Sequence, residues 1–116
     1  MHRIAGSGLL ALDVLIADSC AESASTYAGG TCGNVLSILG YFGWNAMPIA
    51  TVGDDSAAQR VLADLRRWNV SLDRVAVDST RRTPVFVQTL HRDSQGGPRH
   101  SFNTACPLCG GALAPS

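Results

Sequence analysis

Apolar residues dominate the first part of the chain without a helical period. Residues 4–16 are apolar except for their glycines, Ser7 and Asp13, and this Leu-, Val- and Ile-rich run predicts one buried β-strand that ends near the aspartate. Residues 19–28 are small and polar, which is typical of a loop or a short edge strand. The chain is therefore expected to open with a strand.

Two segments show helical periodicity. In the first, which starts at Asn34, apolar residues at i, i+3, i+4 and i+7 predict an inward face, and Gly43 is expected to end the helix. These inward residues are Val35, Ile38, Leu39 and Phe42. The second helix follows a turn and N-cap at residues 54–56, and its predicted inward residues are Ala58, Val61, Leu62, Leu65 and Trp68.

Strand patterns separate and follow these helices. Residues 47–53 predict a strand between the helices, and residues 74–77 and 83–92 carry β-branched and alternating residues. A turn at "DSQGGP" and the segment 99–103 predict a hairpin. Strand, helix, strand, helix and further strands in this order predict an α/β fold with a partly parallel sheet.

Composition and charge narrow the class of protein. The 116 residues are 46% apolar, enough for one domain with a core, and the nine basic residues, all arginine, balance nine acidic ones. We therefore expect neither nucleic acid nor a membrane as a partner. Because Asp13 interrupts the apolar stretch 8–17, we expect a soluble, cytoplasmic protein rather than a signal or membrane span, with its four cysteines reduced.

The stretch "GGTCGN", residues 29–34, is the first candidate site. Its glycines precede a predicted helix whose free N–H groups point toward them, and an asparagine offers a donor and an acceptor to one hydroxylated ligand. A turn with Asn34 as helix cap is the alternative. Asp13 adds a carboxylate that could accept hydrogen bonds from vicinal hydroxyls or cap a neighbouring turn, and both interpretations stay open.

Motifs for nucleotide binding are matched less well than this candidate site. The segment "GSGLLA", residues 6–11, matches a dinucleotide fingerprint only in its letters, because no complete strand precedes it. A P-loop is excluded, since the chain contains no lysine.

Several motifs in order resemble the ribokinase-like (PfkB) carbohydrate kinases. The resemblance runs from Gly6 to Val87 and includes Asp13, "GGTCGN", "LGYFGW", "IATVGDDSAAQRVLADLRRWNVSLDRV" and "TPVFV". It implies the N-terminal part of a ribokinase-like α/β sandwich with lid-type strands, over residues 1–104. It also implies that Asp13, Gly29, Gly30 and Asn34 bind a sugar or nucleoside, and that a homodimer forms through the lid strands. Ala58 and Asn69 stand where the family has glycine.

The catalytic motif of that family is absent. The resemblance implies that full-length relatives use ATP and Mg²⁺ to phosphorylate a hydroxymethyl group, with an anion hole and a catalytic aspartate in a D-T-x-G-A-G-D motif. No such motif occurs in these residues. We therefore expect an inactive fragment of about the first third of such an enzyme, without a catalytic residue or cofactor of its own.

A separate motif closes the chain. In residues 105–116, "CPLCGG" has the spacing of a zinc half-knuckle, in which Cys106 and Cys109 would supply two of four ligands. His91 and His100, a second copy of the chain, or residues of a longer protein could supply the rest, and an empty dithiol or simple turn is the alternative. The rival to a kinase fragment is thus a non-catalytic, zinc-stabilised interaction module. A third interpretation is a chain that does not fold stably, because an incomplete sheet exposes an edge and an apolar face.

Overall fold

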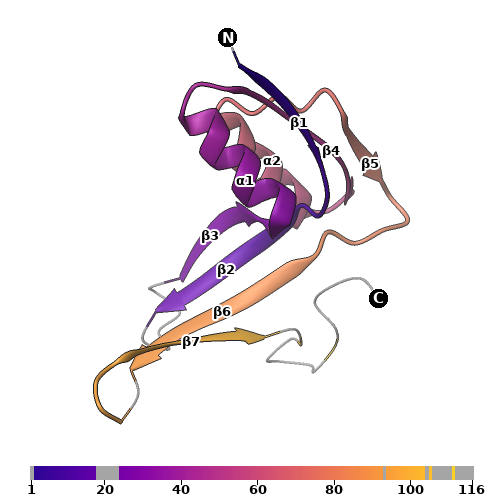
Figure 1. Ribbon diagram of the computed structural model, residues 1–116. Coiled ribbons are helices and arrows are strands. Elements are labelled where there is room, and N and C mark those ends of the chain that lie inside the picture. The colour runs from indigo at the N-terminus through magenta and orange to yellow at the C-terminus, as the bar shows by residue number, and fades with distance from the viewer. Residues whose placement is uncertain (1, 18–23, 93, 104, 106–110, 112–116) are drawn as a thin grey trace.

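The computed structural model describes residues 2–17, 24–92, 94–103, 105 and 111, and these residues form a mixed α/β fold (Figure 1). Its elements, in chain order, are β1 (Arg3–Ser7), β2 (Ala11–Ala17), β3 (Ala24–Gly29), α1 (Gly30–Tyr41), β4 (Asn45–Gly53), α2 (Ser56–Arg67), β5 (Val75–Asp78), β6 (Val85–Arg92) and β7 (Pro98–Asn103). The α/β class expected from the order of periodic segments is confirmed.

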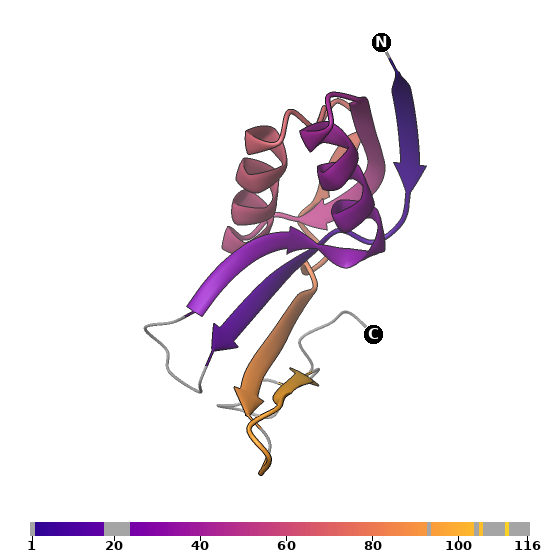
Figure 2. The ribbon, with the colours of Figure 1, turned by 60° about the vertical axis from the view of Figure 1, so that its left-hand side comes forward.

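The strands form two sheets. The parallel sheet has the order β1-β4-β5, and α1 and α2 cover one of its faces (Figure 1). The second sheet has the order β3-β2-β6-β7, with β2 and β6 parallel and the outer pairs antiparallel. Both helices contact its strands β2 and β3, and its other end extends away from them (Figure 2). The segment 24–28, expected as a loop or short edge strand, is the edge strand β3, and the predicted hairpin is β6 and β7.

The prediction of a single strand over residues 4–16 is wrong. The chain leaves the parallel sheet after Ser7 and enters the second sheet at Ala11, so one apolar run serves two sheets. The turn between them buries Leu10, which is 1% exposed and belongs to the core. Because β2 continues to Ala17, Asp13 lies inside a strand and not at its end.

The predicted start and inward face of the first helix are also wrong. α1 begins at Gly30, so Asn34 lies inside the helix, and Gly29 is its N-cap. The residues that face the core are Cys32, Gly33, Leu36 and Gly40. Of the predicted inward residues, Leu39 does pack against the core, whereas Ile38 and Phe42 are 57% and 70% exposed. Small residues on the inner face explain the difference, because a Cβ on Gly40 would lie 2.5 Å from the carbonyl oxygen of Trp68.

The second helix follows its prediction. Val61 and Leu65 are fully buried in the hydrophobic core, and the Asp55 carboxylate caps the helix by accepting a hydrogen bond from the Ala58 N–H. Asn69, which replaces a glycine of the family pattern, has φ 62°. Asparagine tolerates this left-handed conformation better than most residues, so the turn is preserved without glycine.

Asp55 also joins three parts of the fold. Its carboxylate accepts hydrogen bonds from the Thr83 N–H at 2.9 Å and the Thr83 hydroxyl at 2.7 Å, and that hydroxyl accepts one from the Gly53 N–H. Burial opposes ionisation of Asp55, but these hydrogen bonds, the one from Ala58 and the nearby Arg82 charge together lower its pKa. The ionised carboxylate therefore stabilises the contact between the end of β4, the start of α2 and the segment before β6.

We expect Asp55→Ala to lower the free energy of unfolding by about 3 kcal/mol, because it removes a helix cap and leaves the buried Thr83 groups unpaired. Asp54→Ala, at the exposed neighbouring position, should change it by less than about 0.5 kcal/mol. Urea denaturation measures both. Since the folded-state pKa is lowered, the contribution of Asp55 is present above its unfolded pKa and should disappear as pH falls through the folded value. Equal losses in the two variants would contradict this assignment.

Candidate functional site

A cavity of about 480 Å³ lies between the start of α1 and the second sheet, and we call it the Asp13 cavity. β2 contributes Asp13, α1 contributes Gly30, Thr31 and Asn34, and β6 contributes Phe86 and Gln88. The structure therefore brings together three of the predicted site residues, Asp13, Gly30 and Asn34.

Strand register determines which side chains reach this cavity. Asp13 on β2 pairs with Phe86 on the parallel strand β6. Because side chains alternate along a strand, Gln88 lies on the same face of β6 as Phe86, and both line the cavity together with the aspartate. The two sheet strands thus place a carboxylate, an aromatic ring and an amide around one space.

Gly29 and Gly30 let the helix start lie against Asp13. A Cβ on Gly29 would collide with the Asp13 carboxylate, and a Cβ on Gly30 would collide with the carbonyl oxygen of Leu9. Gly30 also has φ 80°, a conformation that side chains other than glycine rarely adopt. Gly29 is not among the residues that line the cavity; it makes room for the carboxylate that does.

The helix start beside this carboxylate has no side-chain cap. Gly29, in an extended conformation, is the N-cap, so the interpretation of Asn34 as the cap is wrong. The Cys32 N–H donates to the Leu9 carbonyl at 3.1 Å, which fixes the first turn of α1 on the turn before β2. The first N–H groups of a helix have no partners within the helix, so this end of α1 offers donors and the positive end of its dipole.

Asp13 itself has no hydrogen-bond partner within the part of the chain that the structure describes, so it caps no turn there. Burial raises the pKa of its carboxyl group. A half-buried carboxylate without a hydrogen-bond partner is costly, and a ligand that donates hydrogen bonds would lower that cost. The cavity thus combines an acceptor, an amide and free backbone donors, which suits a ligand with several hydroxyl groups.

Thr31, Phe86 and Gln88 are the lining residues that sequence reasoning missed as site residues. The alternation in residues 83–92 predicted the strand that carries Phe86 and Gln88, but it did not show that this strand pairs with β2. Thr31 stands within "GGTCGN", so the motif pointed to it without assigning it a role.

The cysteines and the dinucleotide motif are the other candidates from the sequence. Cys106 and Cys109 lie outside the described residues, and no group of three or more His, Cys, Asp or Glu side chains that could hold a metal occurs among those that are described. Cys32 is buried and free, as expected for a reduced thiol.

Residues 6–11 lead into β2 rather than a helix, so the context of a dinucleotide fingerprint is missing. In the described part of the chain, neither helix is long and apolar enough to span a membrane.

Comparison with solved structures shows the same fold in sugar kinases. The PfkB protein from Polaromonas sp. JS666 is 20% identical with a TM-score of 0.70, and the alignment covers 97% of this chain and 37% of that chain. The apo fructokinase from Vibrio cholerae O395 is 18% identical with a TM-score of 0.67, over 97% and 36% of the two chains. The 2-dehydro-3-deoxygluconokinase from Thermotoga maritima is 19% identical with a TM-score of 0.69, over 97% and 34%.

The chain therefore spans about a third of the length of these structures, and at such identities the likeness shows the fold. A comparison with curated proteins finds no match. The profile of the pfkB family carbohydrate kinases, however, matches residues 13–97, which include the Asp13 cavity and both helices. From this match, and from a ribokinase-like fold shared with sugar kinases, the chain belongs to the pfkB family of carbohydrate kinases.

Proposed function

We propose that these residues form the substrate-binding part of a carbohydrate kinase and that the Asp13 cavity binds a sugar or nucleoside. The observation that carries the proposal is the Asp13 carboxylate, which lies without a hydrogen-bond partner among the described residues, beside the uncapped start of α1. Asp13, Gly30 and Asn34 belong to the motifs that resemble the family's substrate site, and they line this one cavity. Gly29 supports the site from behind the carboxylate.

Each side chain in the cavity has a proposed role in binding. The Asp13 carboxylate accepts hydrogen bonds from two vicinal hydroxyls, and the Asn34 amide donates to one ligand oxygen while accepting from another. The ring of Phe86 offers an apolar face to the C–H groups of the sugar. Together they orient the ligand from both the helix side and the sheet side.

The catalytic steps need groups that these residues do not supply. Phosphoryl transfer requires a base for the attacking hydroxyl and donors or metal ions for the phosphate charge. The 116 residues contain no D-T-x-G-A-G-D motif. We therefore assign no catalytic residue, and we attribute the binding of ATP and Mg²⁺ to full-length relatives of the family.

We expect the purified 116-residue protein to transfer no phosphate from ATP to D-fructose or another sugar, because base and anion hole are both missing. The measurement is ADP release in the presence of Mg²⁺, with and without the sugar. Sugar-dependent ADP release by the pure chain would contradict the assignment of these residues to substrate binding alone.

Substrate binding itself is tested by titrating the chain with D-fructose and following the backbone amides by NMR. We expect saturable shifts at Gly30, Thr31, Asn34 and Gln88, with a dissociation constant of about millimolar, because much of a complete site is absent. A permethylated fructose, which keeps the ring but has no hydroxyl donors, is the matched control and should cause no such shifts. Equal responses to both compounds would refute the proposed recognition of hydroxyl groups.

Other features of the proposal rest on family resemblance or on the final residues. The division into a kinase part at 1–104 and a tail at 105–116, the cytoplasmic location and a homodimer through the lid-type sheet stay predictions. The alternative of a zinc-stabilised module depends on Cys106 and Cys109, and stoichiometric zinc whose removal unfolds the protein would favour it.

A further inference from the structure

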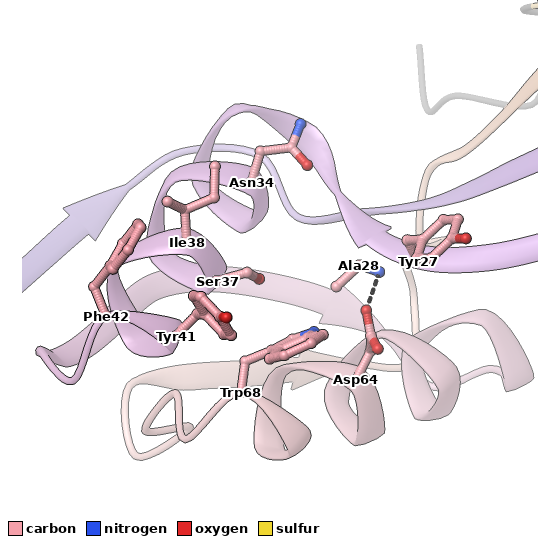
Figure 3. A pocket seen from close by; sticks show the side chains of 9 residues that line it. All are labelled: Tyr27, Ala28, Asn34, Ser37, Ile38, Tyr41, Phe42, Asp64 and Trp68. Carbon is pink, nitrogen blue, oxygen red and sulfur yellow. Dashed lines mark hydrogen bonds between the residues drawn. The ribbon is translucent and has the colours of Figure 1, made fainter.

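α1 and α2 enclose a second cavity, of about 500 Å³, which the proposed function does not use (Figure 3). Ser37 and Tyr41 line it from α1, Asp64 lines it from α2 and Trp68 from the C-cap of α2, and Tyr27 lies at its β3 end. We call it the interhelical groove. Its volume lies within the range of small-molecule sites, about 300 to 1,000 Å³.

Aromatic rings form much of the surface of the interhelical groove. The rings of Tyr41 and Trp68 are 5.7 Å apart and meet edge to face at 76°. The Arg67 guanidinium lies 5.2 Å from the centre of the Trp68 ring, which further restrains that ring. Tyr27 and Tyr41 remain 50% and 67% exposed, so large aromatic surfaces border an open space.

Two buried polar side chains at the groove, Asp64 and Ser37, have one hydrogen-bond partner or none. Asp64 is only 4% exposed, and its Oδ2 accepts one hydrogen bond, at 2.7 Å, from the Ala28 N–H. Within the described residues it has no ion pair, although a buried carboxylate normally has several donors. The Ser37 hydroxyl oxygen is buried and has no partner there at all.

These groups approach the same space from opposite helices. In Figure 3 the Ser37 hydroxyl and the Asp64 carboxylate both point into the region between α1 and α2, with Trp68 beside them. A ligand with N–H donors would satisfy both oxygens, and a positive charge would complement the carboxylate. A flat ring could pack against the exposed surfaces of the aromatic side chains.

We propose that the interhelical groove is a second ligand site, for a flat aromatic compound that carries a cationic N–H donor group. The ring lies against Trp68 and Tyr41, and the donor group binds the Asp64 carboxylate and the Ser37 hydroxyl. Asn34 lines both this groove and the Asp13 cavity, so the two sites are neighbours across one turn of α1.

Benzamidine, an aromatic ring with a cationic amidine, is the probe. Titration followed by NMR should shift the indole N–H signal of Trp68 in a saturable way, with a dissociation constant of about millimolar. The chain contains two tryptophans, and Trp44, stacked on His2 at 4.8 Å, is an internal reference that should not move. Benzyl alcohol, which has the ring without the charge, should bind about tenfold more weakly.

Three variants separate this site from unspecific attraction. Asp64→Asn should weaken benzamidine binding about tenfold and Ser37→Ala about threefold. Ser37→Ala removes a buried hydroxyl without a partner, so it should leave the chain at least as stable, and its lower affinity cannot come from unfolding. Asp73→Asn removes an equal charge from an exposed position outside the groove and should change affinity less than about twofold.

The proposal is overturned if benzamidine shifts both indole signals alike, or neither. It is also overturned if Asp73→Asn weakens binding as much as Asp64→Asn, since the attraction would then be a general effect of charge. Unchanged affinity in Ser37→Ala would exclude the hydroxyl from the site and contradict the proposed contact.

Discussion

Gly30→Ala is expected to lower the free energy of unfolding by about 4 kcal/mol or more, which would leave little of the stability of a domain of this size. The alanine Cβ would meet the carbonyl oxygen of Leu9, and the backbone at Gly30 has φ 80°. The Leu9 carbonyl cannot move away freely, because it also accepts a hydrogen bond from the Cys32 N–H in the first turn of α1. Urea denaturation of the variant measures the loss.

Gly43→Ala provides the matched control. Gly43 has φ 88°, close to that of Gly30, but a Cβ there would meet no atom within 4 Å. This variant should lose only about 1 kcal/mol, which is the cost of the left-handed conformation alone. Similar losses in both variants would show that α1 does not begin in close contact with the turn before β2.

Asp13→Asn is expected to weaken D-fructose binding at least tenfold, roughly, because a neutral amide replaces a carboxylate that accepts two hydroxyl hydrogen bonds. The folded chain should be as stable as before or more so, since the carboxylate has no partner among the described residues. Asp73→Asn, at an exposed position, is the control for loss of charge and should bind fructose unchanged. Equal affinity of Asp13→Asn and the parent chain would exclude Asp13 as a ligand-binding residue.

Stability and sugar binding should depend on pH in opposite directions at Asp13. Burial raises the folded-state pKa of Asp13, so its contribution to stability is present below the unfolded pKa and is lost as pH rises through the folded value. Sugar binding needs the ionised carboxylate and should weaken as pH falls through that raised pKa. Both dependences should be absent from Asp13→Asn.

Much of the fold was predictable from local patterns. The amphipathic repeat of α2 and the cap at Asp55 fix that helix within the sequence itself, and the alternation before "DSQGGP" predicts the hairpin. The single strand over residues 4–16 was wrong because hydrophobicity alone does not show that an apolar run passes from one sheet to another.

The prediction of the inward face of α1 is largely wrong for a related reason. Helical spacing predicts four inward residues, of which only Leu39 packs against the core, while Val35, Ile38 and Phe42 are exposed. Glycines with Cys32 and Leu36 form the rest of the inner face. A glycine has almost no hydrophobic signal, yet it decides how closely a helix can pack. The apolar face left outside includes part of the wall of the interhelical groove.

For the candidate site, the order of the motifs predicts the residues from β2 and α1 but not those from β6. Asp13, Gly30 and Asn34 belong to motifs that can be recognised by type and spacing, and they line one cavity. Phe86 and Gln88 reach it only because β6 pairs in parallel with β2, a long-range contact that no local pattern specifies. The role of Gly29 likewise depends on where the Asp13 carboxylate lies.

Intermolecular NOEs between D-fructose and the chain would show directly whether the sugar binds in the Asp13 cavity. We expect NOEs from the sugar C–H protons to the ring protons of Phe86, and none to the ring of Trp68 in the interhelical groove. NOEs to Trp68 without any to Phe86 would contradict sugar binding in the Asp13 cavity.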